Sequence, residues 1–255
     1  MESKAYEYMD WPRIEAVVYG EEASPKDVMA PRLTTDGVLI QGFFPEADKA
    51  EVLVGSRKYE MEQEDEAGYF AAMIPGRKIP DYKYRVTKGE ETKEFADPYA
   101  FSGQITEAEE KAFCAGVYYH AYEKLGAHPM EINGVKGTSF AVWAPNAMRV
   151  SVVGDFNAWD GRCHAMHRMP MSGIFELFIP GVKAGDIYKY ELKLKGNRIE
   201  LKSDPYAACT EVPPANASVV ADTSVFQWED ETWMKERKKF SDRKQPISIY
   251  ETSLT

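Results

Sequence analysis

The segment with the clearest chemical potential is residues 154–160, Gly-Asp-Phe-Asn-Ala-Trp-Asp, which follows a β-branched stretch at 149–153. Its glycine, aspartate and asparagine suit a tight turn. Trp159 stands among polar residues, which favours an exposed indole, and such an indole offers a flat apolar face to the C–H face of a pyranose ring. Alternatively, Trp159 folds back over the edge of a sheet. The segment therefore predicts a turn that either binds sugar or covers a sandwich edge.

Three possible metal ligands follow this turn: Cys163, His164 and His167. A zinc site would need a fourth ligand and tetrahedral geometry, and the stretch that carries these residues otherwise resembles an ordinary strand. We find no Ser-His-Asp pattern in a recognisable context and no Gly-rich phosphate loop. The sequence therefore predicts neither a metal ion nor another cofactor.

The turn belongs to an internal repeat, in which six short blocks recur in the same order with an offset that grows from 100 to 107 residues. Small loop insertions would produce such a drift. The longest matches are Tyr82-Lys83-Tyr84 with Tyr188-Lys189-Tyr190, and Asp97-Pro98-Tyr99-Ala100 with Asp204-Pro205-Tyr206-Ala207. The repeat predicts two homologous domains, in which residues 38–101 and 138–208 have the same strand order.

Each copy consists of short alternating segments that are separated by turn residues, as at 138–143, 173–180 and 186–195. Strands at this spacing, without long helices between them, are typical of antiparallel β-sandwiches. The fold class is therefore mainly β, with two tandem immunoglobulin-like sandwiches and short linking helices. In this fold Trp143 and Tyr190 are expected to be buried.

Three helices are expected. One covers residues 11–20, and a second covers 107–115, where residues 106–109 form a capping-box pattern and Gly116 ends the helix. The third covers 230–240 and carries its basic residues toward the C-terminal end, as the helix dipole favours. A polar linker at 241–246 then leads to a new strand that starts at 247–250.

Charge and composition narrow the class of partner. The 255 residues include 31 basic and 41 acidic ones, which gives a net charge of −10. Nucleic acids and anionic lipids would be repelled overall, so we expect neither nucleic acid nor membrane as a partner. The first ten residues lack the apolar core of a signal peptide. Together with three widely spaced cysteines, this favours a cytoplasmic protein.

The motif G-D-F-N-x-W at 154–159, followed by Tyr188-Lys189-Tyr190, resembles carbohydrate-binding module family 48. The wider pattern resembles the N-terminal half of bacterial 1,4-α-glucan branching enzymes, a glycoside hydrolase family 13 group that makes glycogen branches. Residues 1–105 resemble the extra N-terminal module that some of these enzymes carry, and 246–251 resemble the entry to their catalytic barrel. The blocks that carry the wider pattern are 122–128, 140–147 and 203–207.

The resemblance implies four parts: an N-terminal sandwich at 1–105, a helical linker at 106–135, a module-48 sandwich at 136–226, and a helix, linker and first barrel strand at 227–255. It also implies a sugar site formed by a turn tryptophan, a strand lysine and a second aromatic residue. Trp159 and Lys189 match the first two. Asn197 or Arg198 stands where the second aromatic is expected, and Asn157 of the turn completes the candidate set. The first copy has Val54 to Arg57 in place of the motif, which implies a structural or weakly binding domain.

A catalytic barrel needs about 250 residues of its own, which two sandwiches and their linkers leave no room for. The resemblance therefore implies a non-catalytic part that binds α-1,4-glucan, such as glycogen or maltooligosaccharides, and that braces its own barrel in the full-length enzyme. Two alternatives stay open. The modules could come from a debranching or trehalose-forming relative, or they could form a purely structural interaction module without sugar affinity.

Overall fold

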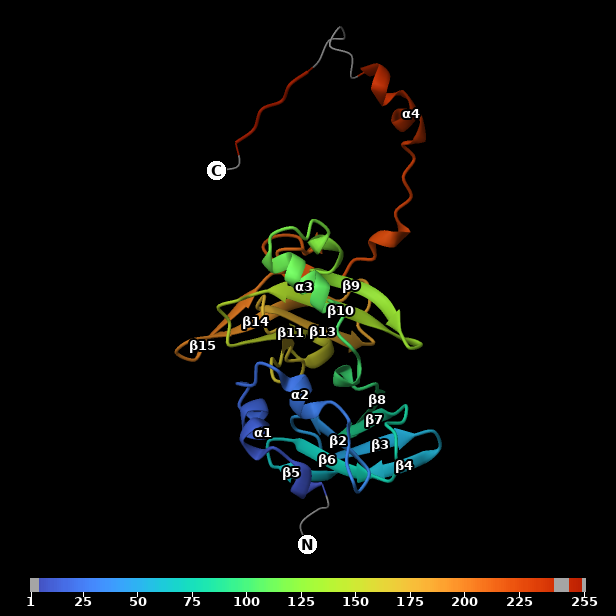
Figure 1. Cartoon of the computed structure of the whole chain (residues 1–255), viewed down its shortest axis with the longest axis vertical. Coiled ribbons are helices and arrows are strands. Elements are labelled where there is room, and N and C mark those ends of the chain that lie inside the picture. The colour runs from blue at the N-terminus through green and yellow to red at the C-terminus, as the bar shows by residue number, and fades with distance from the viewer. Residues whose placement is uncertain (1–4, 241–247, 254–255) are drawn as a thin grey trace. The chain divides into compact units, whose positions relative to one another are not determined.

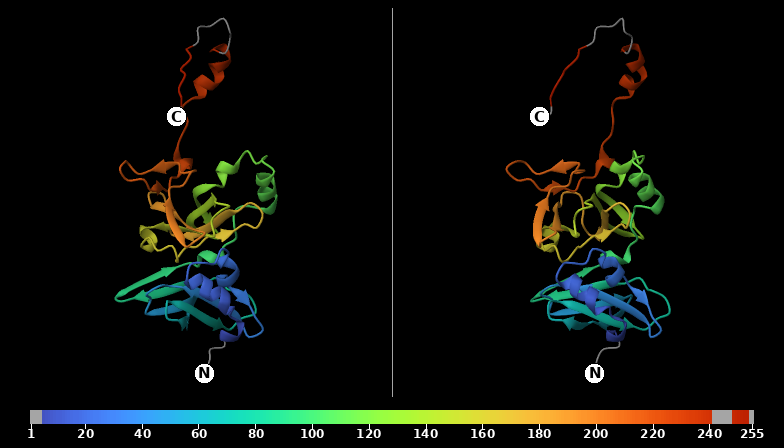
Figure 2. Two further views of the ribbon diagram at one scale, coloured as in Figure 1. Left: turned by 90° about the vertical axis from the view of Figure 1, so that its left-hand side faces the viewer. Right: turned by 60° about the vertical axis from the view of Figure 1, so that its left-hand side comes forward.

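The computed structural model describes residues 5–240 and 248–253 and divides into two compact units between Asp222 and Thr223. Strands of residues 32–95, coloured blue to teal, and strands of residues 126–219, coloured green to orange, form two separate sets in the first unit (Figures 1 and 2). Three short helices precede them: η1 (Tyr6–Tyr8), α1 (Trp11–Val18) and α2 (Pro25–Met29). The helix expected at 11–20 is thus present as α1.

The first sandwich consists of two antiparallel sheets with the strand orders β1-β2-β6-β5 and β4-β3-β7-β8. Its core contains side chains from both sheets, such as Ile40 and Phe70 from one and Val52 and Tyr84 from the other. Alternation places these side chains on the inner faces. The strands are β1 (Arg32–Leu33), β2 (Val38–Phe43), β3 (Lys49–Val54), β4 (Arg57–Glu60), β5 (Glu62–Asp65), β6 (Tyr69–Ile74), β7 (Lys83–Lys88) and β8 (Glu91–Phe95).

The connection between the sandwiches contains η2 (Pro98–Ala100), α3 (Glu107–Cys114) and η3 (Ala121–Glu123). Thr106 caps α3: its hydroxyl accepts the Glu109 backbone N–H at 3.3 Å, and the Glu109 carboxylate accepts the Thr106 N–H at 2.8 Å. The capping box that the sequence predicted is therefore present. The segment 106–135 is not helical throughout, because β9 (Gly126–Ile132) pairs with the second sandwich.

The second sandwich has sheets with the orders β12-β13-β10-β9 and β11-β14-β17-β16, and β15 also pairs with β14. Equivalent strands therefore occupy equivalent places: β1-β2-β6-β5 corresponds to β9-β10-β13-β12, and β3-β7-β8 to β11-β14-β15. The predicted fold class is confirmed, and the predicted common strand order holds for these seven pairs of strands, whereas β4, β16 and β17 have no counterpart in the other sandwich. The further elements are β10 (Val135–Trp143), β11 (Arg149–Gly154), η4 (Asp155–Asn157), β12 (His167–Arg168), β13 (Ile174–Pro180), β14 (Ile187–Leu194), β15 (Arg198–Lys202), β16 (Cys209–Thr210) and β17 (Ser218–Val219).

A buried Tyr-Asp-Tyr triad explains why the two longest repeat blocks recur together. In the first sandwich, the hydroxyls of Tyr82 and Tyr84 donate to Asp97 Oδ2 at 2.5 and 3.0 Å. In the second, three residues repeat this arrangement at 2.6 and 3.2 Å, namely Tyr188, Tyr190 and Asp204. The carboxylates are buried, so each needs these donors to offset its desolvation.

The Asp97 triad gives the fold a pH dependence. Burial raises the pKa of Asp97 from 3.8 to about 6. Because the folded state favours the protonated acid, this contribution to stability is present below the unfolded pKa and is lost as pH rises through about 6. In the wild type, the free energy of unfolding should therefore gain up to about 3 kcal/mol from this group between about pH 7 and pH 4. Asp97→Asn should remove this part of the slope in urea titrations at several pH values.

The informative quantity is the slope of the free energy of unfolding against pH, because asparagine also loses one acceptor and lowers stability at every pH. Asp81→Asn is the control, since Asp81 is exposed and should leave the wild-type slope intact. Identical slopes for wild type and Asp97→Asn would contradict the assignment.

One apolar cluster joins the sandwiches: it contains Ile14 of α1, Met29 of α2 and Phe43 of the first sandwich together with the core of the second. Polar contacts add to it. Lys193 forms an ion pair with Glu21 at 2.9 Å, and Glu176 accepts the backbone N–H groups of Gln104 and Ile105 at 2.8 and 3.2 Å. The connection and the N-terminal helices are therefore held against the second sandwich.

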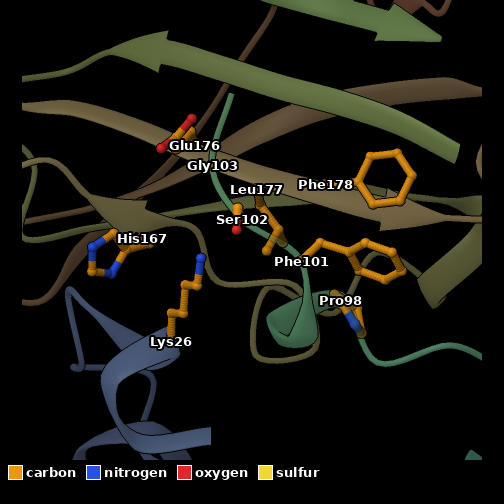
Figure 3. A pocket seen from close by; sticks show the side chains of 9 residues that line it. All are labelled: Lys26, Pro98, Phe101, Ser102, Gly103, His167, Glu176, Leu177 and Phe178. Atoms are coloured by element: carbon orange, nitrogen blue, oxygen red, sulfur yellow. The ribbon is translucent and has the colours of Figure 1, made fainter. Parts of the chain in front are cut away.

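A pocket of about 20 Å³ lies at this junction, which is room for one water molecule. Figure 3 shows Lys26 of α2 facing it beside His167, with Glu176 above them in the view. Burial raises the pKa of Glu176. His167 Nδ1 is buried and has no hydrogen-bond partner among the described residues. The junction is thus polar at this point, although the pocket is too small for a substrate.

Trp143 differs from its expected burial. It is the last residue of β10 and 55% exposed, whereas Tyr190 is 1% exposed as predicted. The Trp143 indole lies 5.9 Å from the Phe113 ring of α3 and donates to the Ser172 carbonyl at 2.9 Å. The end of the strand leaves this indole partly open, because α3 covers only part of it.

The second unit contains η5 (Thr223–Val225) and α4 (Glu231–Phe240). The helix expected at 230–240 is present, and Arg237, Lys238 and Lys239 lie in its last turn. The polar linker predicted at 241–246 lies outside the described residues. So does Ile247, with which the predicted strand begins, and Ser248 to Tyr250 form neither helix nor strand. Among the described helices, none combines the length and the apolar character that a membrane span requires.

Candidate functional site

The turn after β11 is held by one asparagine side chain. Asn157 Oδ1 accepts the Gly154 N–H at 3.0 Å, and its Nδ2 donates to the Val152 carbonyl at 2.9 Å. The next two residues, Ala158 and Trp159, have φ values of 54° and 60° in the left-handed region, which non-glycine residues rarely adopt. The amide of Asn157 is therefore used to hold a strained turn, and we assign it a positioning role.

Trp159 is half-buried and has a fixed orientation. Its indole N–H donates to Asp155 Oδ1 at 2.8 Å, and its backbone N–H donates to the Gly154 carbonyl at 3.0 Å. Of the two arrangements that the sequence allowed, the structure shows an intermediate one. The ring lies on the turn, partly open to solvent, with its polar edge already satisfied. This leaves ring surface for stacking.

His164 contacts two residues of the turn, Asn157 and Phe156. It lies 2.9 Å from Asn157 Nδ2 through its Nδ1, and its ring makes an edge contact with Phe156 at 5.8 Å. Burial lowers the pKa of His164 to about 4. The ring is therefore neutral at physiological pH, and Nδ1 can accept the amide hydrogen that Asn157 offers.

Lys189 lies on β14 beside the turn. Its backbone pairs with Val153, while the neighbouring Tyr188 pairs with Gly154. Tyr188 and Tyr190 point into the core, so alternation places Lys189 on the outer face of the sheet. Its ammonium group donates to the amide oxygen of Asn216. The structure thus places Lys189 and the Trp159 turn on adjacent strands at the same end of the sheet.

Asn197 lies elsewhere. It is exposed in the turn between β14 and β15, where Leu194 pairs with Arg198. Along β14, Leu194 is about 17 Å from Lys189 at the usual strand rise. The structure therefore places Lys189 at the end of the sheet where the Trp159 turn begins, whereas Asn197 lies at the other end of β14. Among the described residues, no three His, Cys, Asp or Glu side chains gather to hold a metal ion.

Sequence reasoning missed Arg149, which is buried and fastens the loop that carries Trp159. Its guanidinium donates to Ser151 Oγ, to the Gly161 carbonyl and, at 2.5 Å, to Glu191. The sequence identifies Asp155 only as a turn residue, although its carboxylate orients the Trp159 indole. A charged residue at the start of a β-branched strand, two residues before a serine, is the sequence signal that could have identified Arg149.

These features define a class: tandem immunoglobulin-like sandwiches, the second of which carries a tryptophan turn beside a strand lysine. Comparison with known families agrees with this class. Residues 124–207 match carbohydrate-binding module 48, the isoamylase N-terminal domain. Residues 10–99 match the N-terminal domain of the alpha-1,4-glucan branching enzyme GlgB.

The chain is similar to 1,4-alpha-glucan branching enzymes along nearly all of its length. It is 43% identical over 253 residues to the GlgB of Cereibacter sphaeroides and 39% identical over 249 residues to that of Synechococcus elongatus. These matches cover 98% and 95% of this chain but 35% and 32% of those proteins. A pullulanase of Anoxybacillus sp. LM18-11 has 17% identity over 78% of this chain and 28% of its own, with a TM-score of 0.34, too low to support an argument.

The chain is therefore similar to the N-terminal region of 1,4-alpha-glucan branching enzymes, and its two sandwiches match two family models in turn. It spans about a third of the length of the curated relatives that it matches. The other two thirds of those relatives have no counterpart in these 255 residues.

Proposed function

We propose that this chain is the non-catalytic, α-glucan-binding part of a branching enzyme of glycogen synthesis, and that Trp159 and Lys189 form its sugar site. The observation that supports this most directly is the Trp159 indole, held by Asp155 with part of its ring open. Lys189, on the adjacent strand, adds a donor for sugar hydroxyls. Asn157 holds the turn, and Asn197 lies too far along β14 to complete the same site.

We also propose that the chain braces the catalytic barrel of the full-length enzyme, in the cytoplasm. Large apolar side chains in the second unit support this part, since Phe226, Trp228 and Trp233 are 63%, 75% and 56% exposed. Phe226 and Trp228 form an edge-to-face pair with ring centroids 5.0 Å apart. Exposed aromatic groups of this size are typical of surfaces that another domain covers.

A purely structural module would share these apolar surfaces, so sugar binding is the discriminating property. We expect wild-type protein to bind maltoheptaose weakly, with Kd in the range of roughly 10 µM to 1 mM. Lys189→Ala should weaken binding only about threefold, because its ammonium already has a partner in Asn216 and stays partly solvated. Titration calorimetry measures the Kd of maltoheptaose for the wild type and for Lys189→Ala.

The matched control is Lys195→Ala, which removes an exposed lysine just beyond the same strand. It should leave Kd unchanged. If wild-type protein shows no heat of binding at millimolar maltoheptaose, the bracing role alone accounts for the module.

A further inference from the structure

A cleft of about 530 Å³ lies between the two sandwiches, within the range of roughly 300–1,000 Å³ that ligand pockets occupy. Strands β7 and β8 line one side with Lys88, Lys93 and Phe95. The turn that carries Trp159 lines the other side with Asp155 and Phe156. The cleft is thus bounded on one side by the candidate sugar-binding turn.

The chemistry of the lining fits a neutral, polyhydroxylated ligand. The lining contains three partly exposed phenylalanines, Phe44, Phe95 and Phe156, together with charged groups of both signs, so the cleft selects neither an anion nor a cation. Lys88 and Lys93 are paired with Glu46 and Glu91 in exposed positions. Exposed ion pairs of this kind are weak, so both ammonium groups can turn to donate to hydroxyls. A sugar needs apolar ring surface for its C–H groups and donors for its hydroxyls, and the cleft offers both.

The cleft is continuous with the Trp159 turn. Asp155 lines the cleft and also accepts the Trp159 indole N–H at 2.8 Å. Phe156, Asn157 and Ala158, which lie between these two residues, line the cleft as well. A glucan chain stacked on the indole therefore has a short path into the cleft.

We propose that this cleft is a second α-glucan subsite, which takes the part of a chain that extends beyond Trp159. The proposal rests on the proposed function, since it needs the Trp159 site to bind glucan. It assigns to the first sandwich a part in sugar binding through Lys88 and Lys93, although that sandwich lacks the tryptophan motif.

The test compares ligand lengths. Wild-type protein should bind maltoheptaose about tenfold more tightly than maltotriose, because only the longer chain reaches both subsites. Lys88→Ala/Lys93→Ala should lose most of this ratio and keep its affinity for maltotriose. The control Lys58→Ala/Lys195→Ala removes two exposed lysines that do not line the cleft and should keep the ratio. Maltoheptaose should also slow amide hydrogen exchange at residues 93–99.

The outcomes separate the two proposals. If neither ligand binds wild-type protein, the proposed function fails and this subsite with it. If binding depends on Trp159 but the length ratio is the same in all variants and residues 93–99 gain no protection, the subsite is overturned while the proposed function stands.

Discussion

Arg149→Ala is expected to lower the free energy of unfolding by about 3–5 kcal/mol, the cost of removing one partner of a buried ion pair. Arg149 is 2% exposed, and its guanidinium lies 2.5 Å from the Glu191 carboxylate. Alanine would leave that carboxylate without its cation and would also free Ser151 and the Gly161 carbonyl. Urea unfolding at neutral pH, followed by tryptophan fluorescence, measures the change.

Arg162→Ala is the matched control. It breaks an ion pair in the same loop, between Arg162 and Asp160 at 2.7 Å, but Arg162 is exposed. It should cost at most about 1 kcal/mol. A second variant, Arg149→Met with Glu191→Gln, removes both charges and should recover much of the loss. Equal costs for Arg149→Ala and Arg162→Ala would show that the buried pair is not what holds this loop.

The fold could be predicted because its stabilising contacts repeat in the sequence. Each sandwich places two tyrosines of a Tyr-Lys-Tyr strand against the aspartate of an Asp-Pro-Tyr block. Both blocks are local, and their order is the same in the two copies, so comparison within one chain identified them. The strands that the two copies share are therefore paired in the same order in both sandwiches.

The site could be predicted only in part, because its geometry depends on groups far apart in the chain. The turn was visible as a local motif, but Arg149 and its partner Glu191 are 42 residues apart, and sequence alone does not pair them. Trp143 was expected to be buried, but Phe140 and Val142 of the same strand point into the main core, so alternation places Trp143 on the opposite face of β10, where α3 covers it only in part. Asn197 was included because of the family pattern, which does not show where the hairpin of β14 and β15 turns.

Trp159→Ala is expected to weaken maltoheptaose binding by about 2 kcal/mol, or roughly thirtyfold, as loss of a central aromatic anchor does. The indole is the largest apolar surface on the turn, and its N–H is already used by Asp155, so stacking is its remaining contribution. Alanine keeps a Cβ at the same left-handed φ of 60°, so the substitution should change the backbone strain little. Calorimetric Kd values for the wild type and Trp159→Ala measure this loss.

Two further variants separate stacking from other effects. Trp159→Phe keeps an aromatic face but loses the hydrogen bond to Asp155, so its affinity should fall between those of the wild type and Trp159→Ala. Trp143→Ala removes another partly exposed indole of the same sandwich, at the end of β10, and should leave Kd unchanged. If Trp143→Ala weakens binding and Trp159→Ala does not, the sugar lies on the face near α3, and the family motif at 154–159 serves the fold alone.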